Sequence, residues 1–479
     1  MGLARSLFDS MPERDIVSWN AMIAAYSQSG YYEDCKEIYG HMCSVEKPKP
    51  DALTLVSVLQ ACAQSEDLRL GMQVHQLIVD NNVEMDIALF NAVILMYAKC
   101  GSLDYARELL NKMDEKDEIT YNSVISGYMN YGFVDKALDL FHELKTPILS
   151  TWNALISGLV QNKWFAGIPE LLQEMQASGF KPNSVTLSSI LPMVSQLSNL
   201  RTGKEVHNFA VRNSLDCDKY VATAIIDTYA KSGFIHGAQT VFEKSKDKSL
   251  VIWTAIITAH ASHGNANRAL DMFQEMLNNG IRPDPVTFTA VLASCAHSGL
   301  VDDAWRIFND MSTKFNVYPL AEQYACMIGV LSRAGRLSEA MDFISKMPVK
   351  PTAKVWGALL NGASVRGDVE VGKYAYDHLL QIEPECTGNY IIMANLYSQA
   401  GRWAEGEEVR GQMNKNKLKK IAGCSWIETN EGIQSFRAKD LSNERSEEIY
   451  EIVEGLLRVM VEEGYISNKE EFVEDLVCS

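Results

Sequence analysis

The sequence predicts an all-α protein built as an α-solenoid, and three observations support this fold class. An apolar stretch in which an aromatic residue precedes Asn or Thr recurs in register with a repeat of 31 to 36 residues, as in "VSWNAMIAAYSQSG", "ALFNAVILMYAKCG" and "VIWTAIITAHASHG". A Gly-containing turn and a second segment with apolar residues at helical spacing follow each stretch, as in "YARELLNKM". Longer units close with Pro-containing segments such as "KPKPD", which cannot continue a helix. Each unit is therefore a helix hairpin, and such hairpins stack into one elongated array.

Ten such units follow one another without gaps. They run over residues 16–51, 52–86, 87–117, 118–148, 149–183, 184–218, 219–249, 250–284, 285–320 and 321–352. Residues 1–15 match the second half of a unit, so we interpret them as a truncated repeat. The hairpin spacing continues in a different sequence through residues 353–420, and residues 421–479 form a last segment with an acidic tail.

Composition narrows the class of protein. Apolar residues make up 47% and charged residues 22% of the chain, which is typical of a folded soluble protein, and no run approaches the roughly 18 apolar residues that span a bilayer. The ten cysteines include no C-x-x-C pair, so we expect a reducing compartment and no zinc site. The net charge of −17 argues against indiscriminate coating of nucleic acid. The sequence still allows a local basic groove elsewhere, because much of the negative charge is concentrated in residues 443–479, which hold 11 acidic and 3 basic residues.

The N-terminal stretch "MGLARSLFDSMPERD" has neither a signal-peptide apolar core nor an Arg- and Ser-rich presequence. Its first six residues fit the myristoylation pattern. The same stretch also matches the second half of a repeat, so the interpretation that the chain begins within a repeat is preferred.

The pattern of the first segments resembles one repeat family. The tetratricopeptide pattern requires W-x-x-L-G-x-x-Y, whereas these units read Asn or Thr, a small residue, an apolar residue and Ile. This pattern resembles pentatricopeptide repeats, and the alternation of 31-, 35- and 36-residue units resembles the subclass with long and short repeats found in plant organelles. The resemblance implies a right-handed α-solenoid. Residues 353–420 are similar to that family's E extension, with two tetratricopeptide-like repeats, and residues 421–479 to its E+ extension.

The recurring polar residue is the fifth of each unit, and we expect it on the exposed inner face of the first helices. Asn and Thr can donate and accept hydrogen bonds, and helical repeats can read one unstacked base per repeat. The resemblance implies that the fifth and last residues of a unit read one base of single-stranded RNA. The base-reading residues predicted in this way are Asn20, Asp51, Asn91, Asp117, Asn122, Asn153, Asn183, Ser188, Asp218, Thr223, Ser249, Thr254, Asp284 and Thr289.

The family code assigns bases to several of these pairs. Uracil is implied for Asn20 with Asp51 and for Asn91 with Asp117, and guanine for Thr254 with Asp284. A pyrimidine is implied for Asn153 with Asn183, and also for Asn122, whose unit ends in Ile148. A purine is implied for Thr223 with Ser249. Guanine is implied for Ser188 with Asp218. The code assigns no base to three pairs: Val56 with Asp86, Thr289 with Leu320, and Ala325 with Thr352. The expected tract reads U-n-U-Y-Y-g-R-G-n-n.

The second position of most units is apolar and could wedge between successive bases, which would add stacking energy. These residues are Val17, Leu53, Ala88, Ile119, Val185, Tyr220, Val251 and Val286, with Ser150 and Glu322 as exceptions. The alternative for the fifth position is that Asn near a helix start caps the helix or bonds to backbone. We assign Trp19, Trp152, Trp253 and Trp356 to packing between helices.

No signature of catalysis is found. A zinc deaminase needs H-x-E and P-C-x-x-C, but none of the nine histidines has Glu two residues later. The chain also stops about where the family's DYW deaminase domain would begin. His260 and His263 are spaced like metal ligands, yet they lack acidic or thiol partners and are interpreted as surface or packing residues. We therefore expect no enzyme activity, no metal and no cofactor.

The resemblance favours a site-recognition factor for organellar C-to-U RNA editing. Its repeats would bind single-stranded RNA, and its E and E+ regions would recruit a DYW-type deaminase and editing-complex proteins, in the mitochondrion or, with slightly less preference, the chloroplast. One alternative keeps RNA binding but serves splicing, stability or translation. A second alternative, from another class, is a peptide-binding scaffold of tetratricopeptide type.

Overall fold

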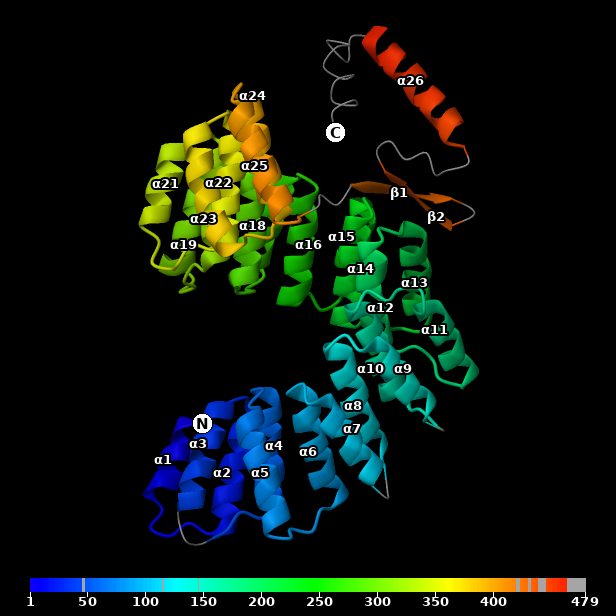
Figure 1. The fold of residues 1–479 in the computed structure, drawn as a ribbon, viewed down its shortest axis with the longest axis vertical. Coiled ribbons are helices and arrows are strands. Elements are labelled where there is room, and N and C mark those ends of the chain that lie inside the picture. Colours follow the sequence, from blue (N-terminus) through cyan, green and yellow to red (C-terminus); the bar gives the residue numbers. More distant parts are fainter. Residues whose placement is uncertain are drawn as a thin grey trace. The chain divides into compact units, whose positions relative to one another are not determined.

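The computed structural model describes residues 1–44, 48–113, 116–144, 146–418, 423–429, 432–437 and 445–462. The chain divides into two compact units, Met1–Ser298 and Gly299–Ser479. Both consist of antiparallel helix pairs, which confirms the predicted α-solenoid (Figure 1). Among the described residues, none of the helices is both long and apolar enough to cross a membrane.

Eight complete helix pairs build the described part of the first unit, together with α1 and with α18, a ninth first helix. The first helices begin at the residues where the predicted repeats begin: α2 (Ile16–Gln28), α4 (Ala52–Gln64), α6 (Ile87–Lys99), α8 (Glu118–Asn130), α10 (Leu149–Gln161), α12 (Ser184–Gln196), α14 (Lys219–Lys231), α16 (Leu250–Ser262) and α18 (Pro285–Ser298). The other helices are α1 (Gly2–Ser10), α3 (Tyr32–Ser44), α5 (Leu68–Asp80), α7 (Leu103–Lys112), α9 (Val134–His142), α11 (Ile168–Ala177), α13 (Leu200–Arg212), α15 (Ile235–Lys244) and α17 (Ala266–Asn278).

The first helices form a continuous layer. Each packs against the next first helix, from α2 with α4 through to α16 with α18, and most second helices pack against the first helices of their own and of the following pair. Most first helices begin after an Asp or Asn whose side chain accepts a hydrogen bond from the third backbone amide of the helix, as Asp86 does from Leu89. The turn inside a pair uses a left-handed residue; at Gly101 (φ +81°) a Cβ would also lie 2.9 Å from the ring of Tyr131.

Aromatic residues join consecutive pairs. Trp152 has no exposed surface and its ring centre lies 4.7 Å from that of Phe141 on the preceding second helix. Phe242 and Trp253 repeat this edge-to-face contact at 4.7 Å. The assignment of the tryptophans Trp19, Trp152, Trp253 and Trp356 to packing is thus confirmed, because all four are buried.

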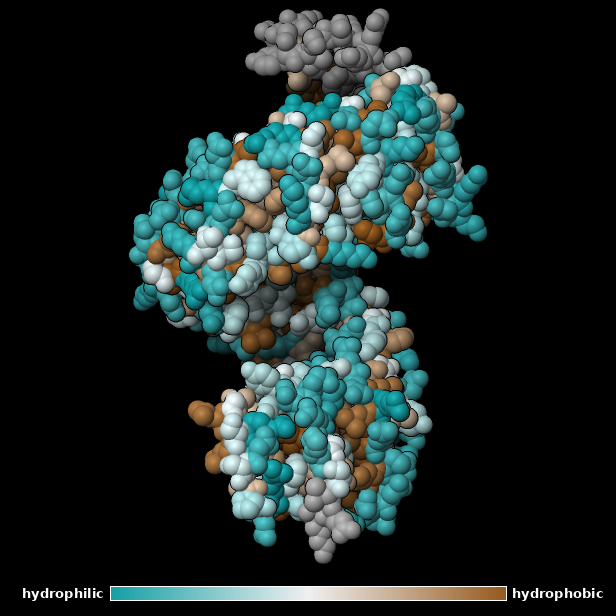
Figure 2. Space-filling view, turned by 90° about the vertical axis from the view of Figure 1, so that its left-hand side faces the viewer, coloured by the Kyte–Doolittle hydropathy of each residue, from teal (hydrophilic) through white to brown (hydrophobic). Residues whose placement is uncertain are grey.

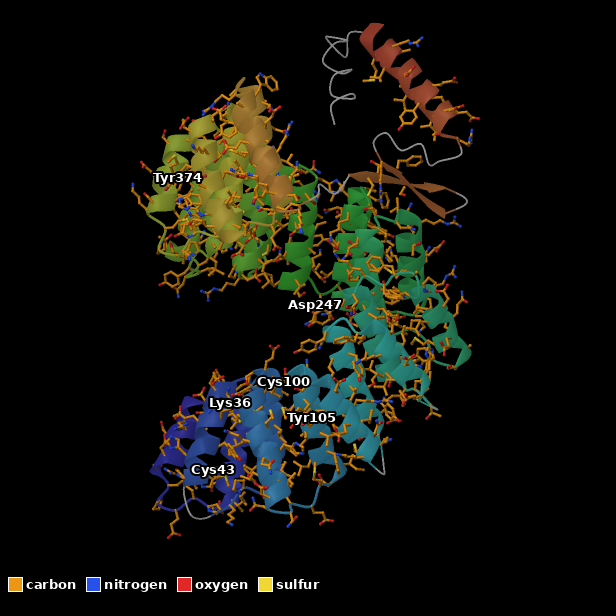
Figure 3. The ribbon with its side chains drawn as sticks, in the orientation of Figure 1. Lys36, Cys43, Cys100, Tyr105, Asp247 and Tyr374 are labelled. Atoms are coloured by element: carbon orange, nitrogen blue, oxygen red, sulfur yellow. The ribbon has the colours of Figure 1, made fainter. Side chains whose placement is uncertain are left out.

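Polar contacts add a second link on the outside of the pairs. Lys36 on α3, labelled in Figure 3, bonds to Asp67 at the start of α5 at 3.1 Å. Arg107 on α7 bonds to Glu143 at 2.7 Å. Hydrophilic side chains cover much of the face drawn in Figure 2, with separate apolar patches between them.

The second unit contains α19 (Val301–Thr313), α20 (Ala321–Arg333), α21 (Leu337–Ser345), α22 (Ala353–Arg366), α23 (Val369–Ile382), α24 (Thr387–Gln399) and α25 (Trp403–Lys415). Helices α20 to α25 share one hydrophobic core. Trp356 stacks on His378 with ring centres 4.1 Å apart, and Tyr374 meets the same tryptophan edge-on at 5.7 Å (Figure 3).

The last described elements differ from a purely helical expectation. Strands β1 (Cys424–Thr429) and β2 (Gly432–Arg437) pair antiparallel, with Trp426 opposite Ser435, and helix α26 (Ser446–Glu462) follows. The strands are short and lie outside the repeat period, so the repeat register carries no information about them. Residues 419–422, 430–431, 438–444 and 463–479 of the predicted C-terminal segments lie outside the described residues.

Candidate functional site

The predicted base-reading residues lie where neighbouring first helices meet. The fifth residue of a unit sits in the second turn of its first helix, and the last residue is the N-cap of the next first helix. Asn20 on α2 donates from Nδ2 to both carboxylate oxygens of Asp51, at 3.0 and 2.9 Å. The hydroxyl of Thr54, one turn into α4, lies 2.5 Å from Asn20 Oδ1 and 2.9 Å from Asp51 Oδ1. We call such a group a junction: it consists of the fifth and last residues of one unit and the third residue of the next unit.

Two further junctions repeat the arrangement. Asn91 donates to Asp117 at 3.1 and 3.0 Å, and the hydroxyl of Thr120 lies 2.5 Å from Asn91 Oδ1. At the third junction the neutral residue Asn183 replaces the aspartate. There Asn153 donates to Asn183 Oδ1 at 3.3 Å, and the Thr186 hydroxyl lies 2.6 Å from Asn153 Oδ1.

The junction stabilises the charge of its aspartate. Burial by itself raises the pKa of Asp117, but hydrogen bonds from the hydroxyl and backbone amide of Thr120 and from the Asn91 amide outweigh it and lower the pKa below its usual value. The pKa of Asp51 is lowered for the same reasons by Thr54 and Asn20. Both carboxylates are therefore ionised at neutral pH and act purely as acceptors.

A fourth junction links its residues through a hydroxyl. Thr254 does not bond to Asp284 directly; its hydroxyl lies 2.8 Å from that of Thr287, which donates to Asp284 Oδ1 at 2.7 Å. Asp284 also accepts the backbone amide of Thr287 at 2.8 Å, so the same carboxylate caps α18.

The expectation that the fifth residue is exposed was wrong at two positions. Asn20 and Asn153 are each 8% exposed. The next first helix covers them, because the side chains of its N-cap and of its third residue close over the amide. The capping alternative was also wrong there, because each amide bonds to the side chain of the last residue of its own unit and to a threonine of the next unit. The signal that sequence reasoning missed is the threonine that recurs at the third position: Thr54, Thr120, Thr186 and Thr287 are all fully buried.

Two other predicted pairs, Ser188 with Asp218 and Thr223 with Ser249, are not joined by a described hydrogen bond. The hydroxyl of Ser188 donates to the Val185 carbonyl and that of Thr223 to the Lys219 carbonyl, each within its own helix. Asp218 caps α14, and within the described residues the buried Ser249 hydroxyl has no hydrogen-bond partner. The hydroxyl of Thr289 donates to the Pro285 carbonyl.

The junction between α8 and α10 is incomplete. Ile148 stands at the cap position, and the Asn122 amide turns to the hydroxyl of Ser150 at 3.1 Å. In the described structure, Asn122 Oδ1 and the Thr151 hydroxyl are buried without a hydrogen-bond partner. A buried polar atom without a partner is destabilising.

Replacing Ile148 with Asp is expected to raise the free energy of unfolding by about 1 kcal/mol, because the new carboxylate caps α10 and accepts from Thr151 and Asn122. Ile148 is 37% exposed, so little apolar burial is lost. Urea unfolding of Ile148→Asp against Ile148→Ala measures the effect. Equal stability of the two variants would contradict it.

The predicted wedge residues point away from the core. All of Val17, Leu53, Ile119, Val185, Val251 and Val286 are between 44% and 68% exposed. Tyr220, Val251 and Val286 line one groove of about 770 Å³ together with Thr223, Thr254 and Asp284. A second groove of about 810 Å³ is lined by Asn153, Asn183 and Val185. Three successive units thus place apolar and hydrogen-bonding side chains in alternation along one surface.

No metal centre is formed within the described part of the chain, where no cluster of three or more potential ligands occurs. His260 is buried and its Nε2 lies 3.0 Å from Gln239 Oε1, while His263 Nε2 lies 2.7 Å from the Ala230 carbonyl oxygen. Both histidines are packing residues, as interpreted from the sequence.

Family models match along the chain. The PPR repeat model matches residues 17–45, 88–117, 119–146, 220–250, 286–314 and 324–350, and the PPR repeat family model matches residues 147–195 and 248–297. The chain belongs to the pentatricopeptide repeat family. The model of the E motif matches residues 366–428, so this pentatricopeptide repeat protein also carries an E motif.

Curated relatives come from Arabidopsis thaliana. Pentatricopeptide repeat-containing protein At2g37310 is 56% identical over 98% of this chain and 71% of its own length. Two others are named mitochondrial (At2g22410, 40% identical over 95% of this chain and 67% of its own length) and chloroplastic (At3g57430, 34% identical over 96% and 50%). The chain spans half to about seven tenths of these relatives.

A solved structure shares the fold. The pentatricopeptide repeat protein PPR10, crystallised with an 18-nucleotide psaJ RNA element, superposes with a TM-score of 0.64 over 87% of this chain and 62% of its own, at 20% identity. At this identity the likeness establishes the arrangement of helix pairs alone.

Proposed function

We propose that this pentatricopeptide repeat protein binds single-stranded RNA in a sequence-specific manner, one base per junction. The observation that carries the proposal is the periodic surface of the first unit. Polar fifth residues, held by the last residues of their units, alternate with exposed apolar second residues such as Val17 and Val286. Amides and hydroxyls read base edges, and apolar side chains stack on base faces.

The structure of PPR10 with bound RNA supports the proposal, since the two chains share the same helix-pair architecture. The net charge of −17 also favours base contacts over bulk phosphate attraction as the source of affinity. In the proposed mode the tract runs U-n-U-Y-Y-g-R-G-n-n, with guanine opposite Thr254 and Asp284.

Binding of the purified chain to this RNA tests the proposal. Changing the base opposite Thr254 and Asp284 from G to U is expected to weaken binding by about 1 to 3 kcal/mol, as one mismatched base does in a specific site. Fluorescence anisotropy at fixed salt measures the difference. Equal, weak binding of both RNAs would remove the base assignment and favour the peptide-binding scaffold, which predicts no dependence on Asn or Thr at the fifth position.

For the biological role we propose recognition of sites for C-to-U editing, with a DYW-type deaminase recruited in trans through the E and E+ regions. The matched E motif at residues 366–428 supports this role, as does the family resemblance of the preceding repeats. The protein itself is proposed to be non-catalytic. Relatives named mitochondrial and chloroplastic support an organellar location, with the mitochondrion preferred.

The alternative role keeps RNA binding but serves splicing, stability or translation of one transcript. It predicts that removal of residues 353–479 leaves function unchanged, whereas recruitment of a deaminase requires them. Editing of the target transcript in plants carrying each form distinguishes the two roles.

A further inference from the structure

We propose that the buried threonine at the third position of a unit is a positioning residue that determines base selectivity at the preceding junction. The inference rests on the proposed RNA binding and assigns a role to Thr54, Thr120 and Thr186, which face neither solvent nor the groove surface. All three are fully buried, yet each hydroxyl lies within 2.6 Å of the fifth residue's Oδ1.

The junction around Asn91 shows how the amide is held. An ionised carboxylate offers only acceptors, so the NH₂ side of Asn91 must face Asp117, at 3.1 and 3.0 Å. The Thr120 hydroxyl carries one proton, which it shares between Oδ1 on the other side of the Asn91 amide, at 2.5 Å, and Asp117 Oδ1, at 2.6 Å. Rotating the amide by half a turn would place its carbonyl oxygen against the carboxylate and break both interactions. The amide therefore has one orientation.

The remaining hydrogen-bonding groups of this amide are available to the ligand. The two N–H bonds of an amide diverge, so one N–H is shared by both carboxylate oxygens while the other stays available, together with one lone pair on Oδ1. Asn91 is half-buried, so part of the residue remains exposed. Uracil presents an N–H donor at N3 beside a carbonyl acceptor, whereas cytosine presents an acceptor at N3 beside an amino donor. An amide of one orientation distinguishes the two, and an amide that can turn does not.

The chain contains its own matched control. Thr151 occupies the same third position and is also fully buried, but Ile148 precedes it and the Asn122 amide turns away to Ser150. Among the described residues, the Thr151 hydroxyl has no hydrogen-bond partner. Removing this hydroxyl changes the same kind of buried site without touching a complete junction.

The test compares Thr120→Val with Thr151→Val in the full chain. Each is titrated with the predicted RNA tract carrying U or C at the third nucleotide. Wild-type protein is expected to prefer U roughly ten-fold, about the effect of one mismatched base. Thr120→Val is expected to reduce this preference to about two-fold, while Thr151→Val leaves it unchanged and Thr120→Ser, which keeps the hydroxyl, restores it.

Retention of the full preference in Thr120→Val, or an equal loss in Thr151→Val, would overturn the positioning role. The preference for G over U at the eighth nucleotide, opposite Thr254, serves as an internal check. A general loss of folding would lower this preference too, whereas loss of positioning at Thr120 alone would leave it unchanged. Failure of the proposed function looks different: wild-type protein then distinguishes neither nucleotide. If Thr120→Val does not fold, Thr120→Ser and Thr120→Ala form the pair that decides, with selectivity expected only in the former.

Discussion

Replacing Trp152 with alanine is expected to lower the free energy of unfolding by about 3 to 5 kcal/mol, the largest stability effect of any single side chain considered for this protein. Trp152 has no exposed surface and packs edge-on against Phe141 at 4.7 Å, so its removal opens a cavity between two consecutive helix pairs. In a solenoid each pair is stabilised by its neighbours. Loss of this contact therefore weakens α9, which carries Phe141, and α10, and with them α8 and α12, since α10 packs on all three.

Hydrogen exchange measured by mass spectrometry checks this prediction element by element. Protection is expected to fall in α8, α9, α10 and α12 and to stay near its wild-type level in α4, which packs against α2, α3, α5 and α6 instead. Trp164, 46% exposed, is the matched control, and Trp164→Ala is expected to cost less than about 1 kcal/mol. Equal losses in the two alanine variants would contradict the packing role.

Trp152→Phe separates ring packing from hydrogen bonding. The indole N–H of Trp152 is buried, and the described structure provides no hydrogen-bond partner for it. Phenylalanine removes this N–H and keeps most of the edge-to-face contact with Phe141, so a much smaller loss than for alanine is expected.

The sequence was sufficient to predict the helix pairs and where each first helix begins. The reason is that the signals are local: apolar spacing defines the helix, and the Asp or Asn before it, such as Asp86, is its cap. Because the units repeat at a regular length, the alignment of one unit predicts where the helices of the next unit begin. Strands β1 and β2 lie beyond the last repeat, and there the period offered no register.

The geometry of the junctions could not be predicted in the same way. Whether a fifth residue bonds to the last residue of its unit depends on side chains about 30 positions apart in sequence, such as Asn20 and Asp51. Asn122 shows the consequence: its own helix resembles the others, but Ile148 removes the acceptor and the amide turns to Ser150. Burial of Asn20 and Asn153 followed from the same non-local packing, which a one-dimensional pattern does not contain.

Replacing Asp117 with alanine is expected to cost about 2 to 4 kcal/mol at neutral pH, because one side chain serves three partners. Its carboxylate accepts the backbone amide of Thr120 at 2.8 Å and the Thr120 hydroxyl at 2.6 Å, and it holds the Asn91 amide. Alanine uncaps α8 and leaves the Asn91 amide without its acceptor, while the Thr120 hydroxyl keeps only Asn91 Oδ1. Asp117→Asn is expected to cost much less, since Asn183 fills the same position at another junction of this chain.

The same carboxylate should make stability depend on pH. The pKa of Asp117 is lowered in the folded chain because hydrogen bonds to the charged form outweigh the effect of burial. A lowered pKa contributes stability above the ordinary carboxyl value of about 4, and this contribution is lost as the pH falls through the lowered value. The stability difference between wild type and Asp117→Asn should therefore shrink between pH 6 and pH 3, to be measured by urea unfolding at each pH.

Asp104 provides the control for both measurements. Its side chain is 95% exposed, so Asp104→Ala is expected to change the unfolding free energy by less than about 0.5 kcal/mol at any pH. A constant difference between wild type and Asp117→Asn across the pH series would mean that the charge of Asp117 adds nothing beyond its geometry. The Asn91 orientation would then depend on shape alone, and Asp117→Asn should bind RNA with unchanged preference for uracil at the third nucleotide. A stability difference that shrinks at low pH would instead mean that the ionised Asp117 carboxylate both stabilises α8 and orients the Asn91 amide.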